Sequence, residues 1–295
     1  MGVLAVVMAV TAGVESVRPG QAGAIALKVS TRARYLRPGE VVLLTVVPSR
    51  PLAALRGEAF GHGVGFWRAG NDESWQGLAG IPLDAEPGSH RITIHGTGRD
   101  GREATASIPL QLVPARFRTR RLRVDDRFLN PPEEISDRIR REAETLRELF
   151  DRVRPGRLWD GVFGMPVPGP VTSAFGRLTV LNGTPRGRHQ GSDLRAEAGT
   201  PVRAPQSGEV VLADDLYYSG NTVIVDHGEG LYSLVAHLSH IAVKVGDRVE
   251  REALLGESGA TGRVTAPHLH WAVRLQGVPV DPLSLAAAVA KRESR

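Results

Sequence analysis

Short apolar stretches alternate with turn residues along the first part of the chain. From residue 24 to residue 113 the turns contain Arg-Pro-Gly, Glu-Pro-Gly and Arg-Asp-Gly and recur about every ten residues. The apolar stretches between them are AIALKVS, EVVLLTVV, LAALRGEAF, GVGFW, LAGIPL, HRITIHG and ATASIPLQLV. Short strands at this spacing are typical of an antiparallel β-sandwich. We therefore expect a sandwich domain over residues 24–115.

A helical pattern follows the basic stretch RFRTRRLRV at residues 116–124. Asn130 is a suitable N-cap, Pro131 suits the first helical position, and Glu133 can bond back to the cap. The apolar positions that follow have helical spacing: Ile135, Ile139, Leu146, Phe150 and Val153. Arg-Pro-Gly at 154–156 ends this pattern. We expect a linker over residues 116–158 that contains a helix at 131–153 and packs its apolar stripe on one of the two domains.

The pattern of short strands returns from residue 159 to residue 289. The clearest strands are VVLADDL, NTVIVDH, LYSLVAHL and HWAVRL, and Gly-Glu-Gly at 228–230 predicts a hairpin turn between the second and the third. Paired short strands at this density indicate an antiparallel sheet folded into a groove. The expected fold is therefore mostly β, with an N-terminal antiparallel sandwich, a connecting helix and a C-terminal groove-forming domain.

The strand within APHLHWAVRL, residues 266–275, has one apolar face and one polar face. Successive side chains of a strand point to opposite sides. The apolar side chains fall on one face: Leu269, Trp271, Val273 and Leu275. His268 and His270 stand next to each other on the other face. A single histidine there would be an ordinary surface residue, but a pair that faces away from the core indicates a shared role.

Composition narrows the chemistry that such a pair can perform. The chain has 34 glycines and 20 prolines, which suits a turn-rich β protein, and it has no cysteine. Any bound metal must then have nitrogen and oxygen ligands. We expect the net charge of +5 to be spread along the chain. The chain has no long basic block with interleaved aromatic residues, which argues against binding of nucleic acid. A mild basic excess suits an anionic polymer such as cell-wall material.

Residues 1–23 have two interpretations. Residues 2–14 are apolar over about half the length that a membrane-spanning helix needs, so we expect no stable membrane span. They resemble the apolar region of a secretory signal, but no Lys or Arg precedes Arg18. An incomplete signal and a first β-strand therefore remain as alternatives.

Three separate segments carry side chains that bind metals. His189 and Asp193 lie in GRHQGSDLRA, His237 lies in VAHLSH, and His268 and His270 share the strand described above. Hydrolytic zinc sites use three nitrogen or oxygen ligands and keep a fourth position for water, which loses its proton near neutral pH. The remaining imidazoles can move protons or stabilise an oxyanion. Spacing alone leaves open which histidine of the pair would bind the metal.

Residues 166–283 resemble the catalytic domain of the lysostaphin-type zinc metallopeptidases, also called the LytM or β-lytic group. The matching segments are GRHQGSDL, AGTPVRAPQSGEVV, GNTVIVDHGEGLYSLVAHLSHI, VKVGDRVERE, LLGESGATGRVTAPHLHWAV and VDPLSL. The stretches LRPGEVVLL and LAGIPLDAEPGSHRITI resemble, more loosely, the immunoglobulin-like module that precedes this domain in some bacterial members.

This resemblance implies roles for the polar side chains. It makes His189, Asp193 and His270 the ligands of one Zn²⁺ per catalytic domain, His268 the general base, and His237 an assistant at the oxyanion. It implies an extracytoplasmic endopeptidase that hydrolyses peptide cross-links of bacterial peptidoglycan by a metal-activated water, with the peptide stems as its substrate. The two histidines that match no functional position are interpreted as a strand-end residue, His227, and a loop residue, His240.

Two other interpretations compete with this one. A catalytically inactive relative could serve as a cell-wall-binding or amidase-activating module, with a regulatory cell-envelope protein as its partner. Such relatives lose ligands, whereas this chain has all of them. APQSGEVV and VKVGDRV also resemble biotinyl and lipoyl carrier domains, but a carrier needs a lysine at a hairpin tip, and Lys244 within VKVG does not fit that position.

Overall fold

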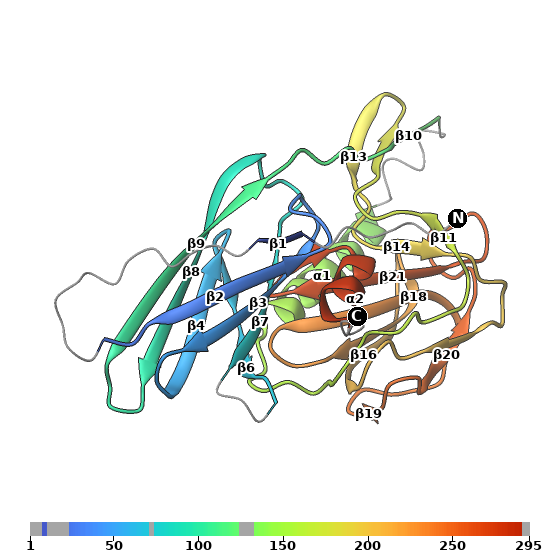
Figure 1. Ribbon diagram of the computed structural model, residues 1–295. Coiled ribbons are helices and arrows are strands. Elements are labelled where there is room, and N and C mark those ends of the chain that lie inside the picture. Colours follow the sequence, from blue (N-terminus) through green and yellow to red (C-terminus); the bar gives the residue numbers. More distant parts are fainter. Residues whose placement is uncertain (1–7, 11–23, 71–73, 124–132, 291–295) are drawn as a thin grey trace. The chain divides into compact units, whose positions relative to one another are not determined.

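The computed structural model describes residues 8–10, 24–70, 74–123 and 133–290, and they form two compact units (Figure 1). The first unit contains the chain up to Ala115 together with Leu283–Val289. The second unit contains Arg116–Pro282. Among the described residues, no helix combines the length and the apolar composition needed to cross a membrane.

The first unit is a sandwich of two antiparallel sheets. One sheet has the order β1 (Met8–Val10), β2 (Leu27–Ala33), β3 (Val41–Pro48), β7 (Trp75–Gly80) and β6 (Phe66–Arg68). The other has the order β5 (His62–Val64), β4 (Leu52–Ala59), β8 (Gly88–Gly98) and β9 (Glu103–Leu112). Buried side chains from both sheets form one core, among them Leu44, Leu52 and Ile94. The predicted antiparallel sandwich is confirmed. Of residues 1–23 only β1 is described, so the proposed signal otherwise lies outside the described residues.

A helix from the far end of the chain belongs to this first unit. In α2 (Pro282–Val289), Leu285 and Ala288 are buried. The amide N–H of Val41 donates to Oγ of the buried Ser284 at 2.8 Å. The guanidinium of Arg32 donates to the carbonyl oxygen of Ala288 at 2.5 Å. The sequence pattern grouped these residues with the C-terminal domain, whereas Leu283–Val289 form part of the first unit.

The second unit is built on a ten-stranded antiparallel sheet. Its main path runs through β11 (Val171–Ser173), β14 (Ser192–Leu194), β21 (Leu269–Leu275), β18 (Leu231–Ile241), β17 (Gly220–Asp226), β16 (Gly208–Leu216) and β19 (Arg248–Val249). Three short strands complete it: β15 (Pro201–Arg203), β20 (Leu254–Ser258) and β22 (Val278–Val280). The hairpin predicted at Gly228–Gly230 joins β17 to β18 and is confirmed. On β21 the predicted apolar face is buried, since Leu269, Trp271, Val273 and Leu275 are at most 3% exposed.

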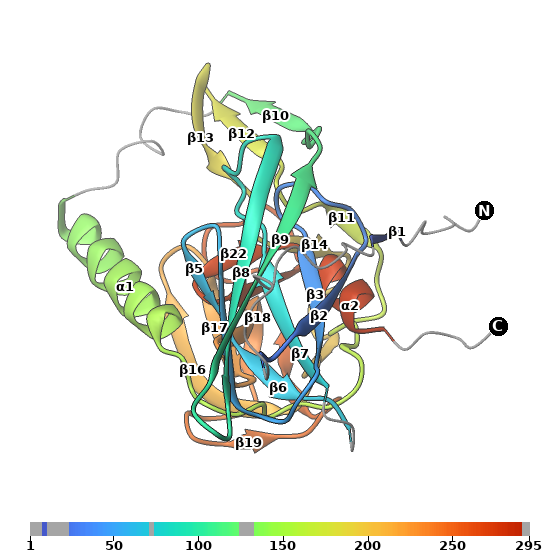
Figure 2. The ribbon, with the colours of Figure 1, turned by 60° about the vertical axis from the view of Figure 1, so that its left-hand side comes forward.

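A long helix, α1 (Glu133–Asp151), packs on three strands of this sheet. Leu149 and Phe150 are buried against side chains of β16, β17 and β18. Figure 2 shows the helix beside this sheet. The expected capping residues Asn130 and Pro131 lie outside the described residues. The apolar stripe is shorter than the sequence predicts, because Val153 lies beyond the helix and is 48% exposed.

A small three-stranded sheet stands out from the same unit (Figure 1). Strands β12 (Leu178–Leu181) and β13 (Thr184–Arg188) form a hairpin whose turn residues Asn182 and Gly183 both have positive φ. Asn-Gly is the preferred pair for this type of turn. Strand β10 (Thr119–Leu122), from the stretch expected to be a linker, pairs in parallel with β12. Neither this hairpin nor β10 was expected from the sequence.

Candidate metal centre

Neighbouring strands place Asp193 and His270 side by side. Asp193 on β14 is directly opposite His270 on β21, and Ala236 on β18 is opposite His270 on its other side. Directly opposed residues of an antiparallel pair have their side chains on the same face. His189 follows β13 and lies four residues before Asp193. The register of β14 with β21 and one loop therefore bring the three side chains together.

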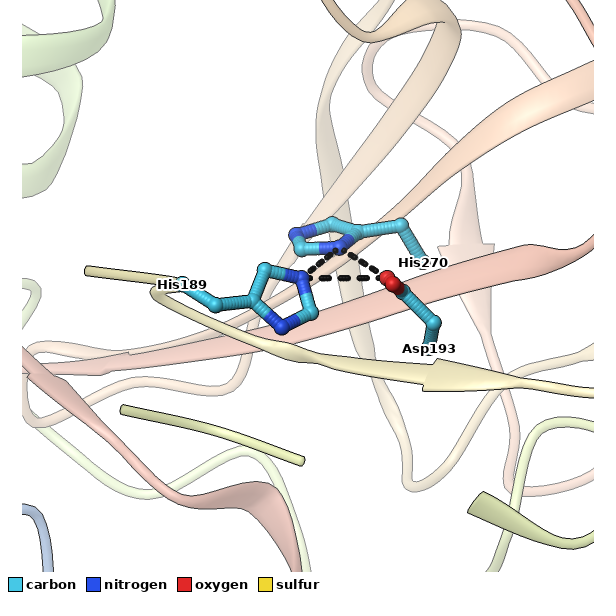
Figure 3. A group of neighbouring side chains, drawn as sticks. All are labelled: His189, Asp193 and His270. Atoms are coloured by element: carbon cyan, nitrogen blue, oxygen red, sulfur yellow. Dashed lines mark hydrogen bonds and ion pairs between the residues drawn. The ribbon is translucent and has the colours of Figure 1, made fainter. Parts of the chain in front are cut away.

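The three side chains present one donor atom each to a common point. His189 Nε2, Asp193 Oδ1 and His270 Nδ1 lie 3.0 Å from one another, and Figure 3 shows the rings and the carboxylate converging. Three ligands at 2.0–2.1 Å from one tetrahedral zinc ion would lie roughly 3.3 Å apart. All three side chains are partly buried. The observed triangle is slightly smaller than that of a zinc site. The donor set and its spacing therefore fit the metal.

Contacts behind the triangle fix its two rings. His189 Nδ1 lies 3.2 Å from Ser173 Oγ and 3.3 Å from the carbonyl oxygen of Ala174, which accepts its proton and leaves Nε2 free to bind a metal. A Cβ atom at Gly191 would lie 2.6 Å from Cε1 and 2.7 Å from Nε2 of His270. The loop can thus pass directly beside the His270 ring only because residue 191 is glycine.

Electrostatics favour a charged carboxylate at Asp193 and a neutral ring at His270. Burial opposes ionisation of the Asp193 carboxyl, but its close contacts with His189 and His270 outweigh burial and hold its pKa well below the usual range. Burial lowers the pKa of His270, and the neighbouring Asp193 opposes that effect only in part. An ionised carboxylate and neutral imidazoles are the forms that bind metals.

His268 lies beside the triangle with one nitrogen turned toward it. It precedes β21 and forms a single bridge with Gly259. Its Nδ1 donates to the carbonyl oxygen of Ala266 at 2.9 Å, so Nε2 carries the lone pair of the neutral ring. That Nε2 lies 3.7 Å from Asp193 Oδ1. The ring can therefore accept a proton at the edge of the site.

His237 reaches the same place through an unusual backbone. Strand β18 pairs with β21 up to Ala236 and with β20 from Leu238, and His237 between them has φ 65°. Left-handed φ is uncommon outside glycine and is found at functional sites. The His237 ring lies 4.9 Å from that of His268 and 5.9 Å from that of His270, between centroids. Burial lowers the pKa of His237 to about 4.

The remaining histidines of this unit lie away from the triangle. His227 follows β17 and is fully buried, with Nδ1 donating to the Ser207 carbonyl and Nε2 accepting from the Ser233 hydroxyl. The interpretation of His240 as a loop residue is wrong, because it lies within β18.

Sequence reasoning missed the groups that orient the histidines. Ser173 and the carbonyl of Ala174 hold His189, and the carbonyl of Thr261 accepts from His237 Nδ1 at 3.0 Å. These partners lie 15 to 24 residues from the histidines that they orient. Every residue has a backbone carbonyl group, so the sequence cannot show which carbonyl accepts a given hydrogen bond.

An antiparallel sheet that gathers two imidazoles and a carboxylate, with two more imidazoles beside them, defines a candidate metal-dependent hydrolase. The model of Peptidase family M23 matches residues 187–282, which include all five of these side chains. A crystal structure from Pseudomonas aeruginosa that carries the designation peptidase M23 is 31% identical and superposes with a TM-score of 0.65. The match covers 86% of this chain and 96% of that one. This chain belongs to peptidase family M23.

Two curated relatives are each similar to about a third of this chain. Peptidoglycan DD-endopeptidase ShyA of Vibrio cholerae is 40% identical over 109 residues, which are 36% of this chain and 25% of ShyA. DD-carboxypeptidase/endopeptidase Mpg of Neisseria meningitidis is 41% identical over 98 residues, 33% of this chain and 23% of Mpg. The chain thus spans about a quarter of the length of these relatives.

Proposed function

We propose that the second unit is a zinc-dependent endopeptidase that hydrolyses peptide cross-links of bacterial peptidoglycan. The observation that carries this proposal is the triangle of donor atoms 3.0 Å apart, with two further histidines next to it. Family M23 and the names of the two relatives support the reaction and the substrate.

His189, Asp193 and His270 would hold the zinc ion through the three atoms of the triangle. When bound there, zinc would polarise the scissile carbonyl and lower the pKa of a water toward 7. His189 can bind through Nε2 because Ala174 takes its other proton. Asp193 would supply the negative charge that offsets part of the charge of the metal.

His268 would act as the general base. Its Nδ1 proton is held by the Ala266 carbonyl, so Nε2 can accept a proton from the attacking water and return it to the leaving amine. His237 is held in the same way by Thr261. Its Nε2 can therefore donate to an oxyanion only when the ring carries two protons. The assisting role that the resemblance implies requires an imidazolium at His237 during the reaction.

Zinc content and turnover, measured on the same samples, test these roles. The full chain and its single alanine variants are assayed for bound zinc and for release of soluble muropeptides from isolated sacculi. Replacing His189, Asp193 or His270 should remove the metal. Replacing His268 or His237 should leave zinc near one equivalent and lower the rate by roughly a hundredfold, since each would act on the transition state.

Three outcomes would contradict the proposal. Full zinc in all three ligand variants would reject the ligand set. Loss of zinc from His268→Ala, with retention in His270→Ala, would exchange the roles of these two residues. Stoichiometric zinc with no release of muropeptides by the unaltered protein would favour the catalytically inactive, wall-binding alternative.

Action on peptidoglycan requires a location outside the cytoplasm. We propose that the protein is periplasmic or secreted, because its substrate lies there. Fractionation of the native host, followed by immunoblotting, tests this. A protein found only in the cytosol would contradict both the location and peptidoglycan as the substrate.

A further inference from the structure

The small sheet that stands out from the second unit gathers basic side chains. We call residues 116–123 and 176–188 the basic arm; it comprises β10, β12, β13 and the residues that flank them. It contains eight arginines and no Asp, Glu or Lys: Arg116, Arg118, Arg120, Arg121, Arg123, Arg177, Arg186 and Arg188. Since the whole chain has a net charge of only +5, the rest of it is net negative. The expectation that the charge is spread along the chain is therefore wrong.

The positive charge of the arm is open to solvent. All of its arginines except Arg177 are exposed. Within the described residues, none of the eight forms an ion pair with a carboxylate. Arg188 stacks on Phe117, with its Cζ 5.0 Å from the ring centroid, and donates to the carbonyl oxygen of Gly176 at 3.2 Å. Like charges gathered without counter-ions repel one another, so an anionic partner would relieve this repulsion.

The base of the arm runs directly into the candidate metal centre. The amide N–H of His189 donates to the carbonyl oxygen of Arg177 at 2.9 Å, and that of Gly176 donates to the carbonyl oxygen of His189 at 2.8 Å. Arg188 is the residue before His189. A polymer that places one bond at the triangle therefore lies next to the base of the arm.

We infer that the basic arm binds the free carboxylates of the peptidoglycan strand whose cross-link enters the site. This inference rests on the proposed function and adds to it the part of the substrate that is recognised. Peptide stems repeat along a glycan strand and carry carboxylates, and arginine pairs with carboxylates through two parallel hydrogen bonds. Single-stranded nucleic acid fits less well, because it needs aromatic side chains for stacking. The one aromatic side chain of the arm, Phe117, is covered by Arg188.

A triple variant, Arg120→Gln, Arg121→Gln and Arg186→Gln, removes charge and leaves Arg177 and Arg188 at the base of the arm in place. The control removes the same charge elsewhere in the unit, with Arg141→Gln and Arg147→Gln on α1 and Arg248→Gln on β19 at the opposite edge of the sheet. Full-length proteins are sedimented with isolated sacculi at increasing salt, and zinc content and the KM for sacculi are measured.

The arm variant should bind sacculi about tenfold more weakly and raise KM by the same factor, the loss expected for three exposed ion pairs. Its zinc content should stay near one equivalent, and its binding should depend less on salt than that of the unaltered protein. The control variant should bind like the unaltered protein. Sacculi whose carboxyl groups have been amidated should bind the unaltered protein as weakly as the arm variant.

Equal binding by the arm variant and the control would overturn the inference. So would tighter binding to vesicles of phosphatidylglycerol than to sacculi, with no effect of amidation, because the partner of the arm would then be a membrane surface. Binding through the arm without release of muropeptides would instead reject the proposed hydrolysis and leave the inference standing.

Discussion

At the scale of single residues, the loop that leads from His189 to Asp193 has no room for a side chain at Gly191. A Cβ atom there would lie 2.6 Å from both Cε1 of His270 and the carbonyl oxygen of Trp271. The His270 ring can shift more easily than the strand backbone. A methyl group at position 191 therefore acts on the donor triangle through the ring.

We expect Gly191→Ala to weaken zinc binding by roughly 10–100-fold, the range found when contacts behind metal ligands are changed. Zinc affinity is measured by competition with a chelator. Gly164→Ala is the matched control, because the nearest atom to a Cβ there is 3.7 Å away, an ordinary contact. Equal zinc affinity in the two variants would show that the His270 ring moves aside without cost.

His227 is a second residue whose surroundings decide its chemistry. It is fully buried, and both ring nitrogens are hydrogen-bonded when the ring is neutral. Burial lowers its pKa to about 4, although the bond to the Ser207 carbonyl acts in the opposite direction. In the unfolded chain the His227 imidazole keeps a pKa near 6.5. As the pH falls, the unfolded chain therefore binds a proton at this histidine before the folded protein does.

The stabilising contribution of His227 should therefore be complete above about pH 6.5 and be lost as the pH falls toward 4. The free energy of unfolding of the second unit should fall by about 2–3 kcal/mol more between pH 7 and pH 4.5 in the unaltered protein than in His227→Gln, which does not titrate. Denaturant unfolding at the two pH values measures this difference. Parallel losses in both proteins would show that His227 does not control stability in acid.

At the scale of elements, helix α1 is part of the second unit rather than a free connector. The Phe150 ring meets that of Tyr232 edge to face, with centroids 5.6 Å apart, and Arg274 Cζ lies 5.3 Å from the centroid of the Phe150 ring. At the middle of the helix, Glu142 accepts from the amide N–H of Tyr217 at 2.9 Å. The middle and the C-terminal end of α1 are thus attached to the sheet.

Replacing Phe150 with alanine should lower the free energy of unfolding of the second unit by about 3–5 kcal/mol, because a buried ring is removed from a packed core. Val153→Ala, at an apolar position outside the helix that is half exposed, should change it by less than about 0.5 kcal/mol. Denaturant unfolding followed by tryptophan fluorescence compares the two. A small loss in Phe150→Ala would mean that α1 can leave the sheet without unfolding it.

At the scale of the whole molecule, the first unit is completed by residues that follow the peptidase strands. The buried Ser284 of α2 accepts the amide N–H of Val41 at the start of β3. Without that hydroxyl the N–H group would be buried with no partner, which is costly. The sandwich therefore depends on a helix far along the chain to satisfy a buried backbone N–H group.

Ser284→Ala should destabilise the first unit by about 1–3 kcal/mol. It should leave zinc content unchanged, because no ligand lies in that unit. Hydrogen exchange followed by mass spectrometry should show faster exchange in peptides that cover β2 and β3. Ser89→Ala, at an exposed position of β8, is the control and should exchange like the unaltered protein. Faster exchange in both variants, or in neither, would contradict the role of Ser284.

The sequence by itself determined the strands, their turns and the types of the donor side chains. Alternation along β21 and the Gly-Glu-Gly turn act over a few residues, so they can be predicted without knowing the fold. The motifs around His189, Asp193 and the histidine pair supplied the candidate ligands through a family resemblance. The Asn-Gly turn of the β12–β13 hairpin is an equally local signal.

Only the tertiary structure decided how distant segments combine. It brought His189, Asp193 and His270 to 3.0 Å from one another, turned His237 toward them by a left-handed backbone, and placed α2 with the sandwich. It also joined the two arginine-rich stretches, at 116–123 and 176–188, into one basic arm through the pairing of β10 with β12. Such arrangements depend on strand register and on burial between segments far apart in the chain, and neither is encoded in the local pattern of any one segment.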